Sequence, residues 1–384
     1  MAKKKKKSKK YYYVFVAIVL IVVLIVTFLD YKYRFGIVDW AQILQTDSET
    51  SESHESVEVD SIGNLKITFI DVGQGDAILI NFPDGKNMLV DAGEDSAKDE
   101  IEEYLTVNGK KLVLDYVVAT HTDSDHIGSM SYVYENYDVM YSYRPYVKYS
   151  GKTTFADGFI NSGYNPKGTD TYGEYLTGVA NEGTPNVFFT DATDINVTVS
   201  AGDSQIDYSI DFVMPYAKTV EGFKNFTDSN DFSAVIMIKF AGRKILLAGD
   251  MEKEAEKLFT EYYAVNTSEV SGLDCDVLKV AHHGSATSST LGFLNLIKPE
   301  YSVISTGVCD GRYMHPRGVV LDNLTSINSN VYRTDLQGTV TLVISPNGEM
   351  SFTTQTNHYN HLLYHDAYEL TEYKDEIKNF KKNL

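Results

Sequence analysis

The sequence predicts an α/β layered domain preceded by one membrane-spanning helix. Apolar runs of strand length alternate with amphipathic helical segments in two similar halves of the chain. Several of these runs end on Asp or His, which places polar side chains along one edge of a hydrophobic sheet. A stretch of 19 residues without a formal charge lies near the N-terminus. With 384 residues, 43% of them hydrophobic, the chain can bury a sizeable core.

The N-terminal segment has the composition of an uncleaved membrane anchor. Residues 1–10 contain seven lysines. Residues 11–29 are uncharged, and as a helix they span about 28 Å, enough to cross a bilayer core. A cleaved signal peptide is the alternative, but the run is longer than an ordinary signal-peptide core and no small-residue cleavage pattern follows. Because the lysines hold the N-terminus in the cytoplasm, we expect a single-pass protein of the cell membrane with an extracellular domain.

Composition divides the rest of the chain into segments. Residues 30–63 are rich in Ser and acidic residues and lack hydrophobic periodicity, as in a flexible linker. Residues 64–355 contain the predicted folded domain. Within it, residues 141–208 are rich in Tyr, Gly, Asn and Thr, which predicts an insertion near the site. Residues 356–384 are predicted to form a C-terminal helix or tail.

The charge of the chain argues against a general nucleic-acid-binding module. Removing the seven lysines of residues 1–10 from the net charge of −19 leaves −26 on the remainder. An acidic body repels phosphate backbones, so nucleic acid needs bound metal and a local basic patch for contact. Cys275 and Cys309 are too few for a disulfide framework, and their redox state stays open. Nothing in the sequence indicates an obligate oligomer.

The elements follow in order along both halves. In the first half, residues 65–93 predict three strands with turns at GQG and PDGK; a helix at 98–109, a strand at 114–121 and a helix from 127 follow. In the second half, residues 232–250 predict two strands across the turn AGRK; a helix at 251–263 and strands within 275–285 and 301–306 follow.

The stretch THTDSDHIGS, residues 120–129, carries the strongest chemical signal. Alternate residues of an extended segment share a face, so His121 and Asp123 point the same way. Asp125 and His126 enter the turn that follows, which brings four ligand-type side chains into one small volume. A polar loop that merely contains histidines is the alternative. The metal-site interpretation is favoured because other predicted strands end on the same residue types. These are Asp91, Asp250, His282 and His283.

An ordered set of motifs resembles the metallo-β-lactamase superfamily, and most closely the hydrolase domain of ComEC-type DNA-uptake proteins. The resemblance covers residues 64–355. It implies a four-layer αββα sandwich with a metal centre at one edge of its two sheets. The motifs are DVGQGDA (71–77), LVDAG (89–93), THTDSDHIGS (120–129), LLAGD (246–250), LKVAHHGS (278–285), YMHP (313–316) and YRTDLQGTV (332–340).

The resemblance implies a set of metal ligands. Residues 121–126 match the signature H-x-H-x-D-H, with an aspartate in place of its second histidine. Asp250 matches the residue that bridges two metals, and one member of the doublet His282–His283 matches the last ligand. In chain order the implied ligands are His121, Asp123, Asp125, His126, Asp250 and either His283, which is favoured, or His282.

One histidine of the superfamily pattern is absent, since NDFSAV occupies residues 230–235. One or two divalent ions are therefore expected. With two ions, one would have mainly His121, Asp123 and Asp250, and the other Asp125, His126, His283 and Asp250. Because so many ligands are oxygens, manganese is favoured over zinc, which stays an alternative.

Four further residues have expected roles around the metal. Asp91 is expected to orient a ligand histidine, and Asp76 has the same expected role, with a plain turn aspartate as the alternative. His315 and Arg333 are expected to face the substrate phosphate, against the alternatives of a loop histidine and a surface arginine. Asp125 and His315 are the predicted catalytic residues.

These expectations predict a membrane-anchored extracellular hydrolase that cuts phosphodiester bonds with metal-activated water. By resemblance, single-stranded DNA is the leading substrate and DNA-uptake machinery the expected partner. A hydrolase of small or cell-envelope phosphoesters is one alternative, because the chain is acidic and shows no basic groove. A surface binding protein without turnover is another, because a ligand is missing. β-Lactam hydrolysis is least favoured, because fold alone says little about reaction.

Overall fold

The computed structural model describes residues 54–155, 159–164, 169–214, 225–265, 273–309 and 313–382. The predicted cytoplasmic segment and anchor, with most of the linker, lie outside these ranges. Across the described ranges no helix is both long and apolar enough to span a bilayer. The elements below belong to one compact unit, residues 52–155 and 161–384.

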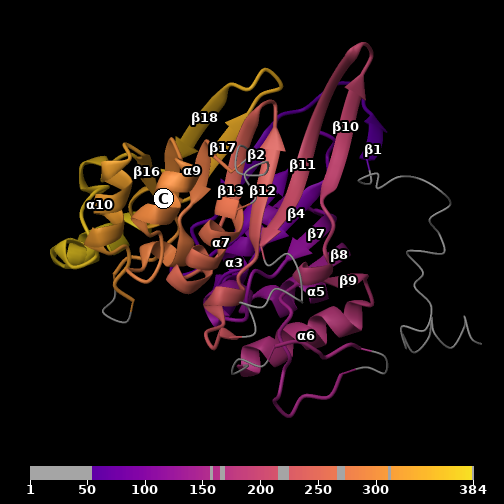
Figure 1. Ribbon diagram of the computed structural model, residues 1–384, viewed down its shortest axis with the longest axis horizontal. Coiled ribbons are helices and arrows are strands. Elements are labelled where there is room, and N and C mark those ends of the chain that lie inside the picture. The colour runs from indigo at the N-terminus through magenta and orange to yellow at the C-terminus, as the bar shows by residue number, and fades with distance from the viewer. Residues whose placement is uncertain are drawn as a thin grey trace, which may run out of the picture. The chain divides into compact units, whose positions relative to one another are not determined.

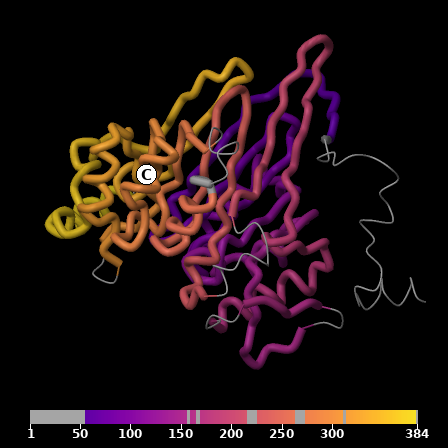
Figure 2. Tube along the Cα trace, in the orientation of Figure 1, coloured from indigo at the N-terminus to yellow at the C-terminus, as the bar shows by residue number. Residues whose placement is uncertain are grey.

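Two eight-stranded sheets form the centre of this unit (Figures 1 and 2). The first has, in spatial order, β1 (His54–Glu58), β10 (Ile195–Ala201), β11 (Ser204–Met214), β12 (Val235–Phe240), β13 (Arg243–Leu247), β14 (Val277–Lys279), β15 (Tyr301–Ile304) and β16 (Asn330–Arg333). The second has β18 (Met350–Thr354), β17 (Val340–Ile344), β2 (Leu65–Phe69), β3 (Ile78–Asn81), β4 (Asn87–Val90), β7 (Leu114–Val118), β8 (Val139–Arg144) and β9 (Asn186–Phe188).

Both sheets change from antiparallel to parallel pairing at the same place in their order. Strands β2, β3 and β4 pair antiparallel, and β7, β8 and β9 continue parallel to β4. Likewise β11, β12 and β13 pair antiparallel, and β14, β15 and β16 continue parallel to β13. Each half therefore offers the carboxyl ends of parallel strands at one edge, where ligands bind in open α/β sheets.

The main hydrophobic core lies between the two sheets. Its members alternate along the strands, for example Leu65, Ile67 and Phe69 on β2, as expected when one face of a strand meets the other sheet. Aromatic rings join the two layers, as where the ring centroids of Phe82 and Tyr208 lie 4.8 Å apart. Such burial of apolar area is the main source of stability in this sandwich.

Helices accompany both sheets, and Figure 1 shows α5 and α6 beside β8 and β9, and α7, α9 and α10 on the side of β13 and β16. The α-helices are α3 (Lys98–Leu105), α4 (Ser124–Ile127), α5 (Met130–Asn136), α6 (Asp170–Glu182), α7 (Lys253–Val265), α9 (Leu291–Ile297), α10 (Gly318–Ser326), α11 (Thr334–Gln337) and α12 (Lys374–Lys381). Short 3₁₀ turns are η1 (Asp95–Ala97), η2 (Phe189–Asp191), η4 (Asn230–Phe232), η5 (Ala281–Gly284), η6 (Asn360–Leu362) and η7 (Glu369–Glu372). The predicted α/β fold of sheets and helices is thus confirmed.

Several boundaries differ from those predicted. Residues 54–58, expected to be flexible linker, form β1 because their backbone pairs with the edge strand β10. The helix expected at 98–109 ends at Leu105, and the two-stranded hairpin β5 (Thr106–Val107) and β6 (Lys110–Lys111) follows it. The segment 141–208 is more than an insertion, since it supplies β9, β10, α6 and the first five residues of β11.

Candidate metal centre

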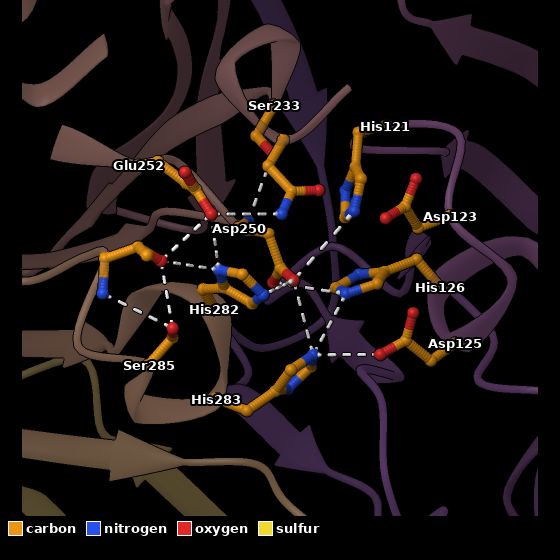
Figure 3. Close-up of polar contacts among 12 residues, drawn as sticks. His121, Asp123, Asp125, His126, Ser233, Asp250, Glu252, His282, His283 and Ser285 are labelled. Carbon is orange, nitrogen blue, oxygen red and sulfur yellow. Dashed lines mark hydrogen bonds and ion pairs between the residues drawn. The ribbon is translucent and has the colours of Figure 1, made fainter. Parts of the chain in front are cut away.

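The predicted ligands come together where strands of both sheets end. His121 to His126 follow β7 through α4, Asp250 follows β13, and the doublet His282–His283 follows β14 within η5. Figure 3 shows these side chains pointing toward one another. The two parallel halves of the sandwich thus deliver one half of the cluster each.

The loop formed by residues 71–76 packs against the segment 121–126. The backbone N–H of Asp76 donates to the carbonyl oxygen of Asp125 at 3.1 Å. Gly75, with a φ of +132°, is required at this approach, because a Cβ atom there would overlap the same carbonyl oxygen. The GQG sequence therefore serves close packing beside the ligands.

Asp91 orients two of the histidines. One carboxylate oxygen accepts from the backbone N–H of Thr120 at 2.8 Å, and the other accepts from the Thr120 hydroxyl at 2.6 Å and lies 2.7 Å from Nδ1 of His126. Because the Thr120 hydroxyl gives its proton to Asp91, it accepts from Nδ1 of His121, 3.0 Å away. Both rings therefore present the lone pair of Nε2, and the predicted orienting role of Asp91 fits this geometry.

The doublet is held in the same manner. Nδ1 of His283 lies 2.9 Å from the carbonyl oxygen of Ser305, and Nδ1 of His282 lies 3.1 Å from Oε1 of Glu252. Both histidines have positive φ, 51° and 55°, a conformation that non-glycine residues adopt rarely and that clusters at functional sites. This strained turn brings both rings toward Asp250.

Four imidazole nitrogens surround the carboxylate of Asp250 (Figure 3). The distances to the nearer carboxylate oxygen are 3.1 Å for His126 Nε2, 3.4 Å for His283 Nε2, 3.8 Å for His282 Nε2 and 3.9 Å for His121 Nε2. Asp125 joins through Oδ2, which is 3.2 Å from Nε2 of His283. The structure therefore brings both members of the doublet to the site, with His283 closer and more deeply buried.

This arrangement fits a divalent cation. The Nε2 atoms of His126 and His283 face each other at 3.3 Å, although the Nδ1 contacts make each of them a lone-pair acceptor. Nε2 of His121 is buried and has no hydrogen-bond partner among the residues that the structure describes. Lone pairs and carboxylate oxygens that converge without donors need positive charge among them.

The electrostatics of the cluster point the same way. Burial by itself would raise the pKa of Asp250, but the surrounding histidines outweigh it and hold that pKa well below its usual range. Burial would lower the pKa of His126, but Asp250 and Asp91 outweigh it and hold that pKa well above its usual range. The site therefore favours positive charge at its centre, whether carried by protons or by a metal ion.

Two predicted residues, Asp123 and Asp76, lie beside the histidines that surround Asp250. Asp123 accepts from the Ser229 hydroxyl at 2.6 Å. Asp76 offers an oxygen within 4.8 Å of ligand atoms of His126, Asp250 and His283. Its Oδ1 approaches the Nδ1 side of His283 at 3.5 Å, and its Oδ2 pairs with Lys279 at 2.7 Å. We assign Asp76 to orienting His283, because it meets the ring on the side opposite the lone pair.

His315 and Arg333 have different outcomes. The ring centroid of His315 lies 5.6 Å from that of His282, and its Nδ1 is buried with no hydrogen-bond partner in the described ranges, so His315 stays a candidate for substrate contact. The guanidinium of Arg333 is fully buried and bound to Asp335 at 3.0 and 2.7 Å. The expectation that Arg333 faces a substrate phosphate is therefore wrong, because its donors are committed inside the protein.

Three residues of the site were not predicted from the sequence. Glu252 orients His282, Ser229 holds Asp123, and Lys279 neutralises Asp76. Lys279 could have been identified from the sequence. It lies inside the apolar run VLKVA, and a lysine is rarely buried there without a partner of opposite charge. Glu252 and Ser229 lie among many similar surface residues, so only the fold identifies them.

The architecture and the cluster define a metal-site hydrolase fold, and comparison with known proteins agrees. Residues 70–308 match the metallo-β-lactamase superfamily. Since this match covers more than half of the chain, the chain belongs to that superfamily.

Three named relatives are similar to this chain over part of their length. It is 27% identical to ComE operon protein 3 of Bacillus subtilis over 76% of this chain and 36% of that protein. It is 35% identical to competence protein ComA of Neisseria gonorrhoeae over 29% of this chain and 15% of that protein. It is 25% identical to recombination protein 2 of Haemophilus influenzae over 72% and 28%. The chain matches about a third or less of each relative's length, and the resemblance to the ComEC-like branch is confirmed.

Proposed function

We propose that this chain is a metal-dependent phosphodiesterase, with single-stranded DNA as its substrate. The observation that carries the proposal is the convergence of four imidazole Nε2 atoms on the carboxylate of Asp250. A site that only stabilised the fold would be closed by its ligands, whereas His282 keeps 21% of its side chain exposed to solvent. That opening admits a substrate.

The residues present fit one or two divalent ions. His126, His283 and Asp125 would hold one, and His121, His282 and Asp123 would share another through Asp250. His282 would then take the place of the histidine that the superfamily pattern has elsewhere. The ligands mix carboxylates with imidazoles, so manganese is proposed and zinc is tested beside it. An ion bound here lowers the pKa of water from 15.7 to about 7 and so supplies a nucleophile at neutral pH.

The chain's own residues position the reaction. Asp91 and Glu252 fix the ring orientations of His126 and His282, so the ligands need no rearrangement. Burial, with His283 and His282 nearby, lowers the pKa of His315 to about 4. His315 is therefore neutral at pH 7, and the single N–H of its imidazole can donate one hydrogen bond to a phosphate oxygen.

Substrate class and placement rest on relatives and on the sequence. The names of the relatives, competence and recombination proteins, support DNA and a role with DNA-uptake machinery. Seven lysines followed by 19 uncharged residues support a single-pass anchor with a cytoplasmic N-terminus and an extracellular domain.

The test compares the full-length chain with Asp125→Ala and His126→Ala variants, each with manganese and with zinc. Metal content and hydrolysis of bis(p-nitrophenyl) phosphate and of single-stranded DNA are measured. We expect metal-dependent turnover that both substitutions abolish. Bound metal without turnover of either ester would contradict the proposal and favour a binding protein. Turnover of the small ester alone would remove DNA as substrate.

A further inference from the structure

A pocket of about 460 Å³ lies between the loop 71–74 and the C-terminal helix α12. The loop contributes Gln74 to its wall, and α12 and the residue after it contribute Lys378, Lys381 and Lys382. Lys378 and Lys382 are four positions apart and therefore share one face of the helix. The predicted tail thus supplies the local basic patch that the sequence did not reveal.

The charge of this pocket is not cancelled by its acids. Lys381 is committed, because its ammonium group pairs with Asp71 and donates to the carbonyl oxygen of Thr334 at 3.0 Å. Glu100 is the other acidic residue of the lining. Lys378 and Lys382 have no ion-pair partner within the part of the chain that the structure describes. In a protein of net charge −19, a pocket with two unpaired lysines is a local site for anions.

The pocket adjoins the metal centre through the same loop. Gln74 is two residues from Asp76, at most about 7 Å along the chain. The hydroxyl of Thr306 lies 3.3 Å from the side-chain oxygen of Gln74 and 3.4 Å from the carbonyl oxygen of His315. Gly307, which also lines the pocket, packs directly against Gln74. The loop 71–76 therefore lines the pocket at one end and contacts the metal centre at the other.

Two other features of the lining suit a nucleotide. The side-chain nitrogen of Gln74 is buried and has no hydrogen-bond partner among the described residues. Tyr313 also lines the pocket. Proteins that bind single strands combine a positive groove with aromatic side chains on which bases stack. A lysine pair with an aromatic ring fits that combination better than it fits a polyol phosphate without bases.

We propose that this pocket is the subsite for the nucleotide next to the cleaved bond, with Lys378 and Lys382 binding its phosphate and Tyr313 contacting its base. The inference rests on the proposed function, because it extends the metal site to a longer single-stranded substrate. It assigns specificity to the C-terminal tail, outside the residues that match the superfamily.

The test measures binding of a fluorescein-labelled oligothymidylate by anisotropy. The full-length chain carries Asp125→Ala to prevent turnover, and inorganic polyphosphate serves as a competitor without bases. Lys378→Ala/Lys382→Ala is expected to weaken binding roughly tenfold and to reduce the slope of log K against log salt by about 0.7, since the two lysines bind one phosphate and each single-strand phosphate contact contributes about 0.7. Tyr313→Ala is expected to weaken oligothymidylate binding but not polyphosphate binding.

The matched control is Lys66→Ala/Lys257→Ala, which removes the same charge from exposed positions on β2 and α7. Equal weakening by control and pocket variants would overturn the proposal, as would absent oligothymidylate binding. Unchanged binding by Tyr313→Ala would overturn the assignment to DNA. Hydrolysis of bis(p-nitrophenyl) phosphate, with Asp125 restored, is expected to survive Lys378→Ala/Lys382→Ala. If the parent chain does not hydrolyse bis(p-nitrophenyl) phosphate, the proposed function is contradicted. The assignment of the pocket is not, because oligothymidylate binding is measured without turnover.

Discussion

The Nε2 atoms of His126 and His283 lie 3.3 Å apart, although 157 positions separate the two residues in sequence. The Nδ1 atom of His126 contacts the Asp91 carboxylate, and that of His283 contacts the Ser305 carbonyl oxygen. Each ring is thus locked with its acceptor nitrogen toward the other ring and toward Asp250. Two sheets joined by long-range packing hold these acceptors together.

The first prediction concerns the carboxylate that orients the ligands. Asp91→Asn keeps the volume but loses the charge that holds Nδ1–H of His126 and the Thr120 hydroxyl. We expect manganese affinity to fall about 10- to 100-fold, the usual effect of losing such a partner, as measured by calorimetric titration. Asp95→Asn, at an exposed position on η1, is the control and should bind metal normally. Equal affinity of the two variants would contradict the orienting role.

The second prediction concerns pH. Although burial lowers the pKa of His126 and His283, the nearby carboxylates raise it well above its usual range, so in the metal-free chain each Nε2 takes up a proton and its lone pair becomes available only when an ion displaces that proton. Their contribution to metal-free stability is complete below the unfolded pKa, about 6.5, and is lost as pH rises through the raised pKa. An ion must displace these protons, so metal affinity should rise with pH. Calorimetry in two buffers of different ionisation enthalpy should show proton release near pH 7; no release would contradict this.

The sequence predicted most of the clustered residues because they follow buried strands. Apolar runs that end on His121, Asp250 or His283 place polar groups at strand ends, and parallel strands bring such ends to one edge. The choice within the doublet was not predictable, since it depends on two consecutive positive φ angles. The prediction that Arg333 faces the substrate was wrong for a similar reason. Its neighbours in space, Asp335 and the C-terminal tail, do not follow from periodicity.

Other parts of the fold depended on partners far away in sequence. β1 has only five residues and few apolar ones, so its extended form depends on pairing with β10, about 140 residues later. The lysine pocket joins loop 71–74 to α12, about 300 residues apart. The three lysines lie together within residues 378–382, but only the fold shows that they face this loop.

The third prediction concerns the buried ion pair of Lys279 and Asp76. Both side chains are almost completely buried and lie 2.7 Å apart. Lys279→Met leaves the carboxylate without its partner and should lower the free energy of unfolding by roughly 3–5 kcal/mol. The double variant Lys279→Met/Asp76→Leu should recover much of that loss, since it removes both charges. Urea unfolding measures both. A single variant as stable as the parent would show that the pair does not hold this edge of the site.

The fourth prediction concerns the cysteines, whose state the sequence left open. Cys275 and Cys309 are both buried and unpaired. Burial raises the pKa of each thiol, so little thiolate is present at neutral pH. Ellman's reagent should react slowly with the native chain and should count both thiols after unfolding without reductant. A count of zero after unfolding would reveal a disulfide and contradict the structure.

The fifth prediction concerns the attachment of the tail. Besides its pair with Asp335, Arg333 donates from Nη1 to the carbonyl oxygens of Leu363 and His365, at 3.1 and 2.6 Å. A lysine cannot make this forked set of bonds. Arg333→Lys should therefore loosen the segment 356–382 that carries α12, and limited proteolysis should cut it sooner than in the parent chain.

The same substitution separates the tail from the metal centre. Since Arg333 is absent from the ligand cluster, Arg333→Lys should leave manganese affinity unchanged while it weakens oligothymidylate binding through the displaced lysines of α12. Arg243→Lys is the control, because Arg243 also bonds a carboxylate and a backbone carbonyl, those of Asp276 and Gly348, away from the tail. If Arg333→Lys reduced metal affinity instead, the original expectation of a role at the metal centre would regain support. If neither tail cleavage nor DNA binding changed, the apolar contacts of the tail alone would suffice to hold it.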